Sequence, residues 1–204
     1  MESQAAAPDD KGTRKQSLVD AAYRLIAGRG FEGLRTRDIA SAVGVNIATL
    51  HYYFPTKEAL VKAVVAHAFT RFRSTLSPEG TATDQLRQHF GGLRRLSREE
   101  PELFAVMGEL ALRAPRDTVI GTLMQATDDA WHGMMRTLLR RARAEGGIDA
   151  AIDPDDFAAL VVVALRGTYL LPVASSHPER VDRALRQIER ILGIGRIAKA
   201  ARSR

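Results

Sequence analysis

The chain has 204 residues, of which 45% are hydrophobic, so it is long enough to bury a core in one or two compact units. It contains no cysteine, which excludes a disulfide framework and a cysteine-ligated zinc site and is consistent with a cytoplasmic location. The net charge of +6 favours polyanionic partners. No apolar run approaches the roughly 20 residues that cross a bilayer, so a membrane partner is not expected.

The N-terminal segment, residues 1–12, is rich in alanine and acidic residues and predicts a disordered arm. A first helix is expected from Thr13 to Ile26, where apolar residues recur at helical spacing, and a Gly-Arg-Gly run then ends it. Three basic residues near its start, Lys11, Arg14 and Lys15, either meet phosphate groups or form an ordinary solvated face.

The stretch from Leu34 to Leu60 has the pattern of two short helices joined by a tight turn, followed by the start of a third. Thr36 is expected to cap a helix that begins at Arg37. Gly44 is expected to end that helix, because a residue past a helix end often needs a positive φ, which glycine reaches without strain. Asn46 is a suitable cap for the second helix. The stretch therefore predicts a helix-turn-helix.

Six further helices are expected after the motif from helical-period apolar residues and turn signals. They are predicted over residues 58–75, 84–96, 101–113, 117–144, 157–173 and 178–192. Ser97 and Glu100 have the spacing of a capping box, and Asp153 followed by Pro154 is typical of a helix start. No strand pattern is present, so the predicted fold is all-α with about nine helices.

The segment from Thr36 to Leu60, which ends Thr-Leu-His-Tyr-Tyr-Phe-Pro-Thr-Lys-Glu-Ala-Leu, resembles the DNA-binding domain of the tetracycline-repressor (TetR-type) family of transcription regulators. The resemblance is specific from about Thr13 to Leu60. Beyond that it rests on the number and order of the helices and on residues 147–167. It implies a three-helix DNA-binding domain over 13–57 and a larger helical ligand-binding and dimerisation domain over 58–192. The composition of residues 193–204 predicts a basic tail.

DNA contacts are expected around the second helix of the motif, because a helix-turn-helix presents the start of that helix to the major groove. The resemblance implies base contacts from Arg37, Ile47, Ala48 and Tyr53, and phosphate contacts from Thr36, Thr49, His51, Tyr52 and Lys57. Asn46, at the start of the helix, completes the predicted set.

His51 stands where the family most often has a tyrosine. It is either a phosphate ligand that binds better when protonated or a neutral surface histidine.

Aromatic and methionine side chains gather in the larger domain, where they either fill an ordinary core or line an apolar pocket. The candidates for ligand contact are Phe72, Phe90, Phe104, Met107, Met124, Asp128, Trp131 and Met135. The polar side chains weighed as anchors are His67, His89, Glu109, Gln125, Asp128 and His132. The resemblance implies that a small-molecule effector binds in this region and releases a repressor from its operator.

The last two long helices predict a homodimer. The helix from Asp156 to Val173 is apolar on more faces than one domain can bury, and the stretch from Val181 to Leu192 adds a second stripe. A central, buried helix would explain the first pattern equally well, but the resemblance favours a four-helix interface. The predicted partners are therefore a palindromic double-stranded DNA operator, a small molecule and a second copy of the chain.

Two other classes of function are compatible with the sequence. Asp128 and His132, one helical turn apart, form the start of a metal or acid–base site if His89 joins them. That spacing alone is a weak signal, and there is no phosphate-binding loop or nucleophile elbow, so no catalytic residue, metal or cofactor is predicted. The other alternative is a helix-turn-helix that binds protein instead of DNA.

Overall fold

The computed structural model describes residues 8–170 and 177–195, which form nine α-helices and two short 3-10 helices and no strand. The predicted all-α fold is therefore confirmed over this part of the chain. The α-helices are α1 (Pro8–Arg29), α2 (Thr36–Val43), α3 (Ile47–Tyr53), α4 (Lys57–Arg73), α5 (Ala82–Glu99), α6 (Pro101–Arg113), α7 (Thr118–Ala144), α8 (Pro154–Leu170) and α10 (Pro178–Ile191). The 3-10 helices are η1 (Phe31–Gly33) and η2 (Ala114–Arg116).

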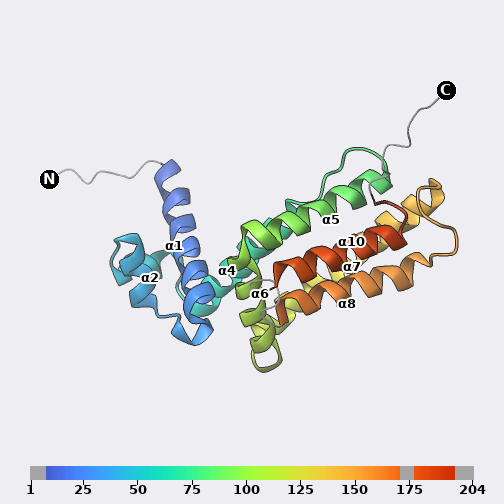
Figure 1. The fold of residues 1–204 in the computed structure, drawn as a ribbon. Coiled ribbons are helices and arrows are strands. Elements are labelled where there is room, and N and C mark those ends of the chain that lie inside the picture. The colour runs from blue at the N-terminus through green and yellow to red at the C-terminus, as the bar shows by residue number, and fades with distance from the viewer. Residues whose placement is uncertain (1–7, 171–176, 196–204) are drawn as a thin grey trace.

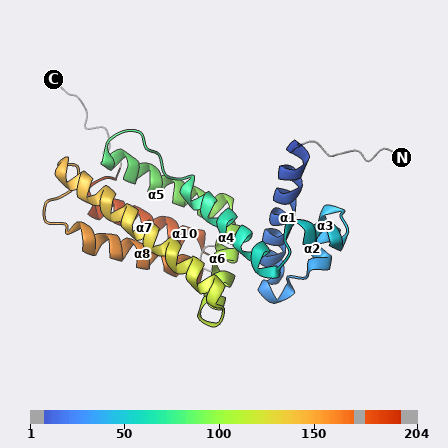
Figure 2. The ribbon, with the colours of Figure 1, turned by 180° about the vertical axis from the view of Figure 1, so that it is seen from behind.

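The molecule is elongated, with α1 to α3 at one end and the remaining helices extending away from them (Figures 1 and 2). We call α1 to α3 the N-terminal unit, and α5 to α8 with α10 the body. The helix α4 joins the two, since it follows α3 directly and ends among the body helices (Figure 1). Any change in the tilt of α4 therefore changes the position of the N-terminal unit.

The first helix is longer than the sequence pattern indicates. It begins at Pro8, so the expectation of a disordered arm is wrong for residues 8–12, while residues 1–7 lie outside the described part of the chain. The apolar pattern marks only the buried part of a helix. A helix that is already nucleated extends beyond that part at little cost, because each added residue gains one backbone hydrogen bond.

Of the two local features predicted near the start of α6, one is confirmed and the other is wrong. Pro101 is the first residue of α6, as expected. Ser97 forms no capping box with Glu100, because Ser97 is buried inside α5 and its hydroxyl donates to the carbonyl of Arg94. A capping box occurs instead at the start of α5, between Thr81 and Asp84.

The described chain end packs onto the body. Ile194, which we expected in a basic tail, is fully buried, and its carbonyl accepts a hydrogen bond from Nε of Arg87 at 3.0 Å. Residues 196–204 and the predicted end of the helix through Val173 lie outside the described residues. Within the described ranges, no helix is both long enough and apolar enough to cross a membrane.

Candidate DNA-binding surface and apolar cavity

The turn between α2 and α3 has the geometry predicted for it. Gly44 has φ 71° and ψ 33°, in the left-handed region, and ends α2. The side-chain oxygen of Asn46 then accepts a hydrogen bond from the backbone N–H of Thr49 at 2.7 Å, which caps α3. Ile39, Ala40 and Leu50 are buried between the helices. Since both helix ends and the crossing are fixed, the outer face of α3 is held in one orientation.

Thr36 does not cap α2. The helix includes Thr36 as its first residue, the cap position belongs to Arg35, and no side chain bonds the free N–H groups there. The one-residue shift places the Thr36 hydroxyl and the exposed Arg37 in the first turn of α2. The open N–H groups of that turn favour an anion such as a phosphate.

The residues predicted to contact DNA lie together on the N-terminal unit and the start of α4. Seven are exposed and three are half-buried. The exposed ones are Arg37, Asn46, Ile47, Ala48, His51, Tyr52 and Lys57, and the half-buried ones are Thr36, Thr49 and Tyr53. Tyr52 is 68% exposed, which is unusual for a large aromatic side chain in a monomer. It meets the ring of Tyr53 edge to face, with centroids 5.1 Å apart.

Two residues of the predicted set are already engaged within the motif. The Asn46 side-chain oxygen accepts from both the N–H and the hydroxyl of Thr49. Asn46 therefore positions α3 and keeps only its amide N–H groups for a base. The ammonium group of Lys57 lies 5.0 Å from the ring centre of Phe31, so the lysine is held at the start of α4.

Lys15 has the same arrangement with Phe54, at 5.7 Å. Phe54 directly follows α3, so Lys15 adds an exposed cation of α1 to those of Arg37 and Lys57 near the helix-turn-helix. We call these three residues the exposed cationic surface.

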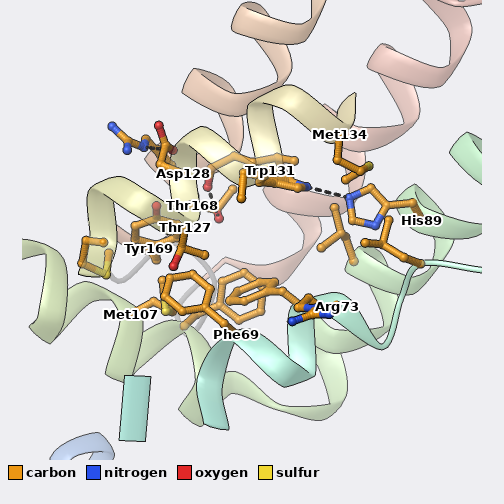
Figure 3. A pocket seen from close by; sticks show the side chains of 18 of the residues that line it. Phe69, Arg73, His89, Met107, Thr127, Asp128, Trp131, Met134, Thr168 and Tyr169 are labelled. Carbon is orange, nitrogen blue, oxygen red and sulfur yellow. Dashed lines mark hydrogen bonds and ion pairs between the residues drawn. The ribbon is translucent and has the colours of Figure 1, made fainter. Parts of the chain in front are cut away.

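A cavity of about 460 Å³, within the range of small-molecule sites, lies between the body helices and the C-terminal end of α4 (Figure 3). Its wall includes six of the eight predicted ligand residues: Phe72, Phe104, Met107, Met124, Asp128 and Trp131. Phe90 and Met135 are fully buried in the core and do not line the cavity, so the prediction of ligand contacts does not hold for these two residues. They lie on helices that do line it, and helical spacing alone does not tell the two faces apart.

The cavity also has lining residues that the sequence did not indicate. They include Phe69 and Arg73 from α4, Thr168 and Tyr169 from α8, and Val181 and Leu185 from α10. These elements are far apart in the sequence and meet only through the tertiary packing.

Of the six polar anchors considered, only His89 and Asp128 face the cavity. Glu109 instead binds a backbone N–H of the N-terminal unit, His67 contacts Gln16, and Gln125 bonds Asp129.

The charged groups of the cavity wall are unevenly paired. Asp128 binds Nε of Arg166 at 2.6 Å, so its charge is neutralised. The Tyr169 hydroxyl lies beside this pair, and burial raises its pKa. Arg73, at the end of α4, has no carboxylate partner among the described residues. His89 is 1% exposed, and burial lowers its pKa to about 4.

The metal or acid–base site considered from the sequence does not assemble. Asp128 is committed to Arg166, and both ring nitrogens of His89 have hydrogen-bond partners, in Thr75 and Trp131. Within residues 8–170 and 177–195, no three His, Asp or Glu side chains are grouped so that they could hold a metal ion.

A helix-turn-helix with an exposed second helix, joined through α4 to a helical body with which α4 forms an apolar cavity, is the arrangement of a DNA-binding transcriptional regulator. Comparison with known families agrees. Residues 18–64 match the bacterial regulatory proteins of the tetR family, and residues 82–193 match the C-terminal domain of BetI-type transcriptional repressors. The second match alone spans more than half of the chain, and the chain belongs to the tetR family.

Two relatives are distant in sequence but match most of the chain. The nucleoid occlusion factor SlmA of Pasteurella multocida is 27% identical over 187 residues, which are 89% of this chain and 93% of the relative. The regulator RutR of Escherichia coli K12 is 29% identical over 153 residues, 69% of this chain and 66% of its own. A TetR transcriptional regulator from Chloroflexus aurantiacus has the same fold, with a TM-score of 0.75 at 20% identity, covering 92% and 98% of the two chains.

Proposed function

We propose that this regulator is a homodimeric repressor that binds a palindromic operator in the cytoplasm and is released by a small, mostly apolar molecule in the cavity. The observation that carries the proposal is that α4 belongs to both sites. Its first residue, Lys57, lies on the exposed cationic surface, and its last two turns contribute Phe69, Phe72 and Arg73 to the cavity wall. A molecule that fills the cavity therefore contacts the helix that positions the N-terminal unit.

Exposed side chains around α3 support sequence-specific binding. Arg37 can make a bidentate bond to guanine, worth about 1–3 kcal/mol of discrimination, and Ile47 and Ala48 can pack on a thymine methyl group. The Thr49 backbone is fixed by Asn46, and Lys57 is held by Phe31, so these groups suit phosphate contacts that set the register without reading sequence.

An exposed apolar stripe on α8 supports the dimer. Leu160, Val163 and Leu170 are 51%, 68% and 47% exposed, and Ile191 on α10 is 49% exposed. The α8 residues recur at helical spacing, and both helices lie in front of α7 in the view of Figure 1. Pairing of these helices between two copies would bury the stripe. It would also provide two DNA-binding units for half-sites about 34–36 Å apart.

The cavity wall supports an effector that is mostly apolar with one polar group. Apolar side chains, aromatic residues and methionines among them, make up most of the wall, and most of its polar groups are engaged in hydrogen bonds or an ion pair within the protein. Methionines adapt to the shape of a ligand, while aromatic rings favour flat or extended molecules. A small hydrophilic ligand would leave most of the apolar wall in contact with water, so it is not expected.

The test is to select bound duplexes from a random pool at near-physiological salt and to sequence them. Enrichment of an inverted repeat, with one dimer bound to each duplex, is the expected result. Binding without enrichment that disappears as salt rises would mean only nonspecific affinity of a basic protein. In that case the helix-turn-helix would be a protein-binding module, and the operator proposal would be wrong.

A further inference from the structure

A chain of hydrogen bonds runs from the cavity wall to the end of α4 through the buried His89. The indole nitrogen of Trp131, on α7, donates to Nε2 of His89 at 3.1 Å (Figure 3). Nδ1 of His89, on α5, lies 2.6 Å from the hydroxyl oxygen of Thr75. That hydroxyl lies 2.6 Å from the carbonyl oxygen of Phe72, in the last turn of α4. We call these four residues the relay.

The direction of every bond in the relay follows from chemistry. The Phe72 carbonyl can only accept, so the Thr75 hydroxyl gives it its proton and accepts from Nδ1–H of His89. The lone pair of Nε2 is then free for the indole N–H of Trp131, which can only donate. This arrangement requires a neutral imidazole, in agreement with the burial of His89. All donors are satisfied while the end of α4 stays in place, and shifting it leaves buried polar groups without partners.

Gly92 provides the close approach that the relay needs. It lies one helical turn after His89 on α5, and a Cβ at Gly92 would lie 2.6 Å from Cβ of Thr75. Only a residue without a side chain lets Thr75 approach α5 this closely. Two features therefore hold Thr75, two residues beyond the end of α4, on α5: the bond from His89, and the contact with the bare backbone of Gly92.

We propose that the relay transmits occupation of the cavity to α4 and so to the N-terminal unit, with His89 and Thr75 as positioning residues. Trp131 and Phe72 both line the cavity, so an occupant that turns the indole or displaces Phe72 breaks the chain of bonds. The end of α4 is then no longer held on α5. This inference rests on the proposed function, and it predicts a coupling in the usual range of about 5- to 150-fold in operator affinity.

Coupling between two sites is reciprocal, so the relay can be tested without an effector. Trp131 is the only tryptophan in the chain, so the tryptophan emission of the protein reports on the surroundings of this one indole ring. We would titrate the full-length protein with the duplex enriched by selection and, separately, with a scrambled duplex of equal length. The expected result is a change in Trp131 emission with the selected duplex that the scrambled duplex does not reproduce.

Thr75→Val removes the hydroxyl while keeping the shape, and Gly92→Ala pushes Thr75 away without removing any polar group. Both variants should still bind the selected duplex but lose the Trp131 response. Thr70→Val is the matched control, because the Thr70 hydroxyl bonds only the carbonyl of Ala66 on the exposed side of α4. An unchanged Trp131 emission in the wild type at saturating duplex, or a full response in Thr75→Val, would overturn the relay.

If no duplex is enriched, the proposed function fails, and the relay is decided by nuclear magnetic resonance. The single indole N–H resonance should shift in Thr75→Val, although Thr75 makes no hydrogen bond to Trp131, and should stay in place in Thr70→Val. No shift in Thr75→Val would overturn the relay by this route as well.

Discussion

Glu109 of α6 accepts a hydrogen bond from the backbone N–H of Phe31 in the N-terminal unit, with Oε2 2.9 Å from the nitrogen. Arg113, one turn later on α6, pairs with Glu32 and lies 4.4 Å from the ring centre of Phe31. A side chain at Gly30 would lie 3.1 Å from the same carboxylate oxygen, and Gly30 has φ 71°. The helix that supplies Phe104 and Met107 to the cavity thus binds η1 directly, in addition to the connection through α4.

Glu109→Ala should lower the free energy of unfolding by about 1–3 kcal/mol, because the part-buried N–H of Phe31 loses the carboxylate that accepts its hydrogen bond. Glu109→Gln should cost less than half as much, since its amide oxygen can still accept. Urea denaturation of both variants measures the difference. Equal losses would mean that the charge of Glu109, and not this hydrogen bond, contributes the stability.

Stability should also depend on the protonation of His89. Its pKa is about 4 in the folded protein, against 6.5 in an exposed histidine. Between these values the unfolded chain binds a proton that the folded chain does not, so the free energy of unfolding falls as the pH falls through this window. The full loss would be about 3 kcal/mol.

His89→Gln provides the comparison, because its amide can accept from Trp131 and donate to Thr75 but does not titrate in this window. Urea denaturation of both proteins at pH 7.5 and 5 should show a steeper decline in the wild type. Parallel declines would mean that folding does not lower the pKa of His89, so that the folded and unfolded chains take up its proton over the same pH range.

The features that the sequence predicted correctly are local. Gly44, Asn46 and Pro154 each act through the backbone of their own helix end, so short-range chemistry is enough to place them. The expected capping box at Ser97 is wrong because α5 continues through that residue, and packing of a buried face outweighs a cap signal.

The cavity and the relay depend on long-range packing. The bond between His89 and Trp131 joins residues 42 positions apart, and nothing in the sequence near either residue indicates it. The aromatic composition indicated that a cavity was plausible, but not which helix faces would line it. Phe90 illustrates this, because it follows His89 directly yet points into the core.

Lys57→Ala should weaken DNA binding uniformly across sequences and reduce the slope of log K against log salt by about one unit, since one phosphate contact is lost. Lys62→Ala is the control, because Lys62 is exposed on α4 beyond the predicted DNA surface and should leave the slope unchanged. Arg37→Ala should instead relax preference at one base pair of each half-site. Fluorescence anisotropy with the selected duplex and its point variants measures both effects. A loss of preference in Lys57→Ala would contradict the phosphate assignment.

Val163→Glu should convert the dimer to a monomer and abolish tight operator binding. Val163 is 68% exposed in the single chain, so the new carboxylate does not disturb the fold, but at a dimer interface two copies would bury unpaired charge. Sedimentation equilibrium measures the mass, and Gln125→Glu, on the exposed side of α7, is the control. A dimeric Val163→Glu variant would place the interface elsewhere on the body.

Arg73 has no carboxylate partner among residues 8–170 and 177–195, so we expect the cavity to prefer an acid to a base. Two probes with the same ten-carbon chain, decanoate and decyltrimethylammonium, isolate the sign of the charge from apolar burial. Decanoate should bind more tightly, because its carboxylate can pair with Arg73, whereas the cation would have to compete with Arg166 for Asp128. Quenching or enhancement of Trp131 emission measures both affinities, since Trp131 lies in the cavity wall.

Arg73→Gln should weaken decanoate binding about fivefold, the effect expected of a solvent-accessible ion pair, and should leave the cation unaffected. Asp128→Asn is the reciprocal variant: it frees Arg166 and should leave decanoate binding as tight or tighter. If the cation binds better in the wild type and Asp128→Asn abolishes that binding, then Asp128 is the ligand anchor. The effector would then carry a positive charge that displaces Arg166 from its carboxylate partner.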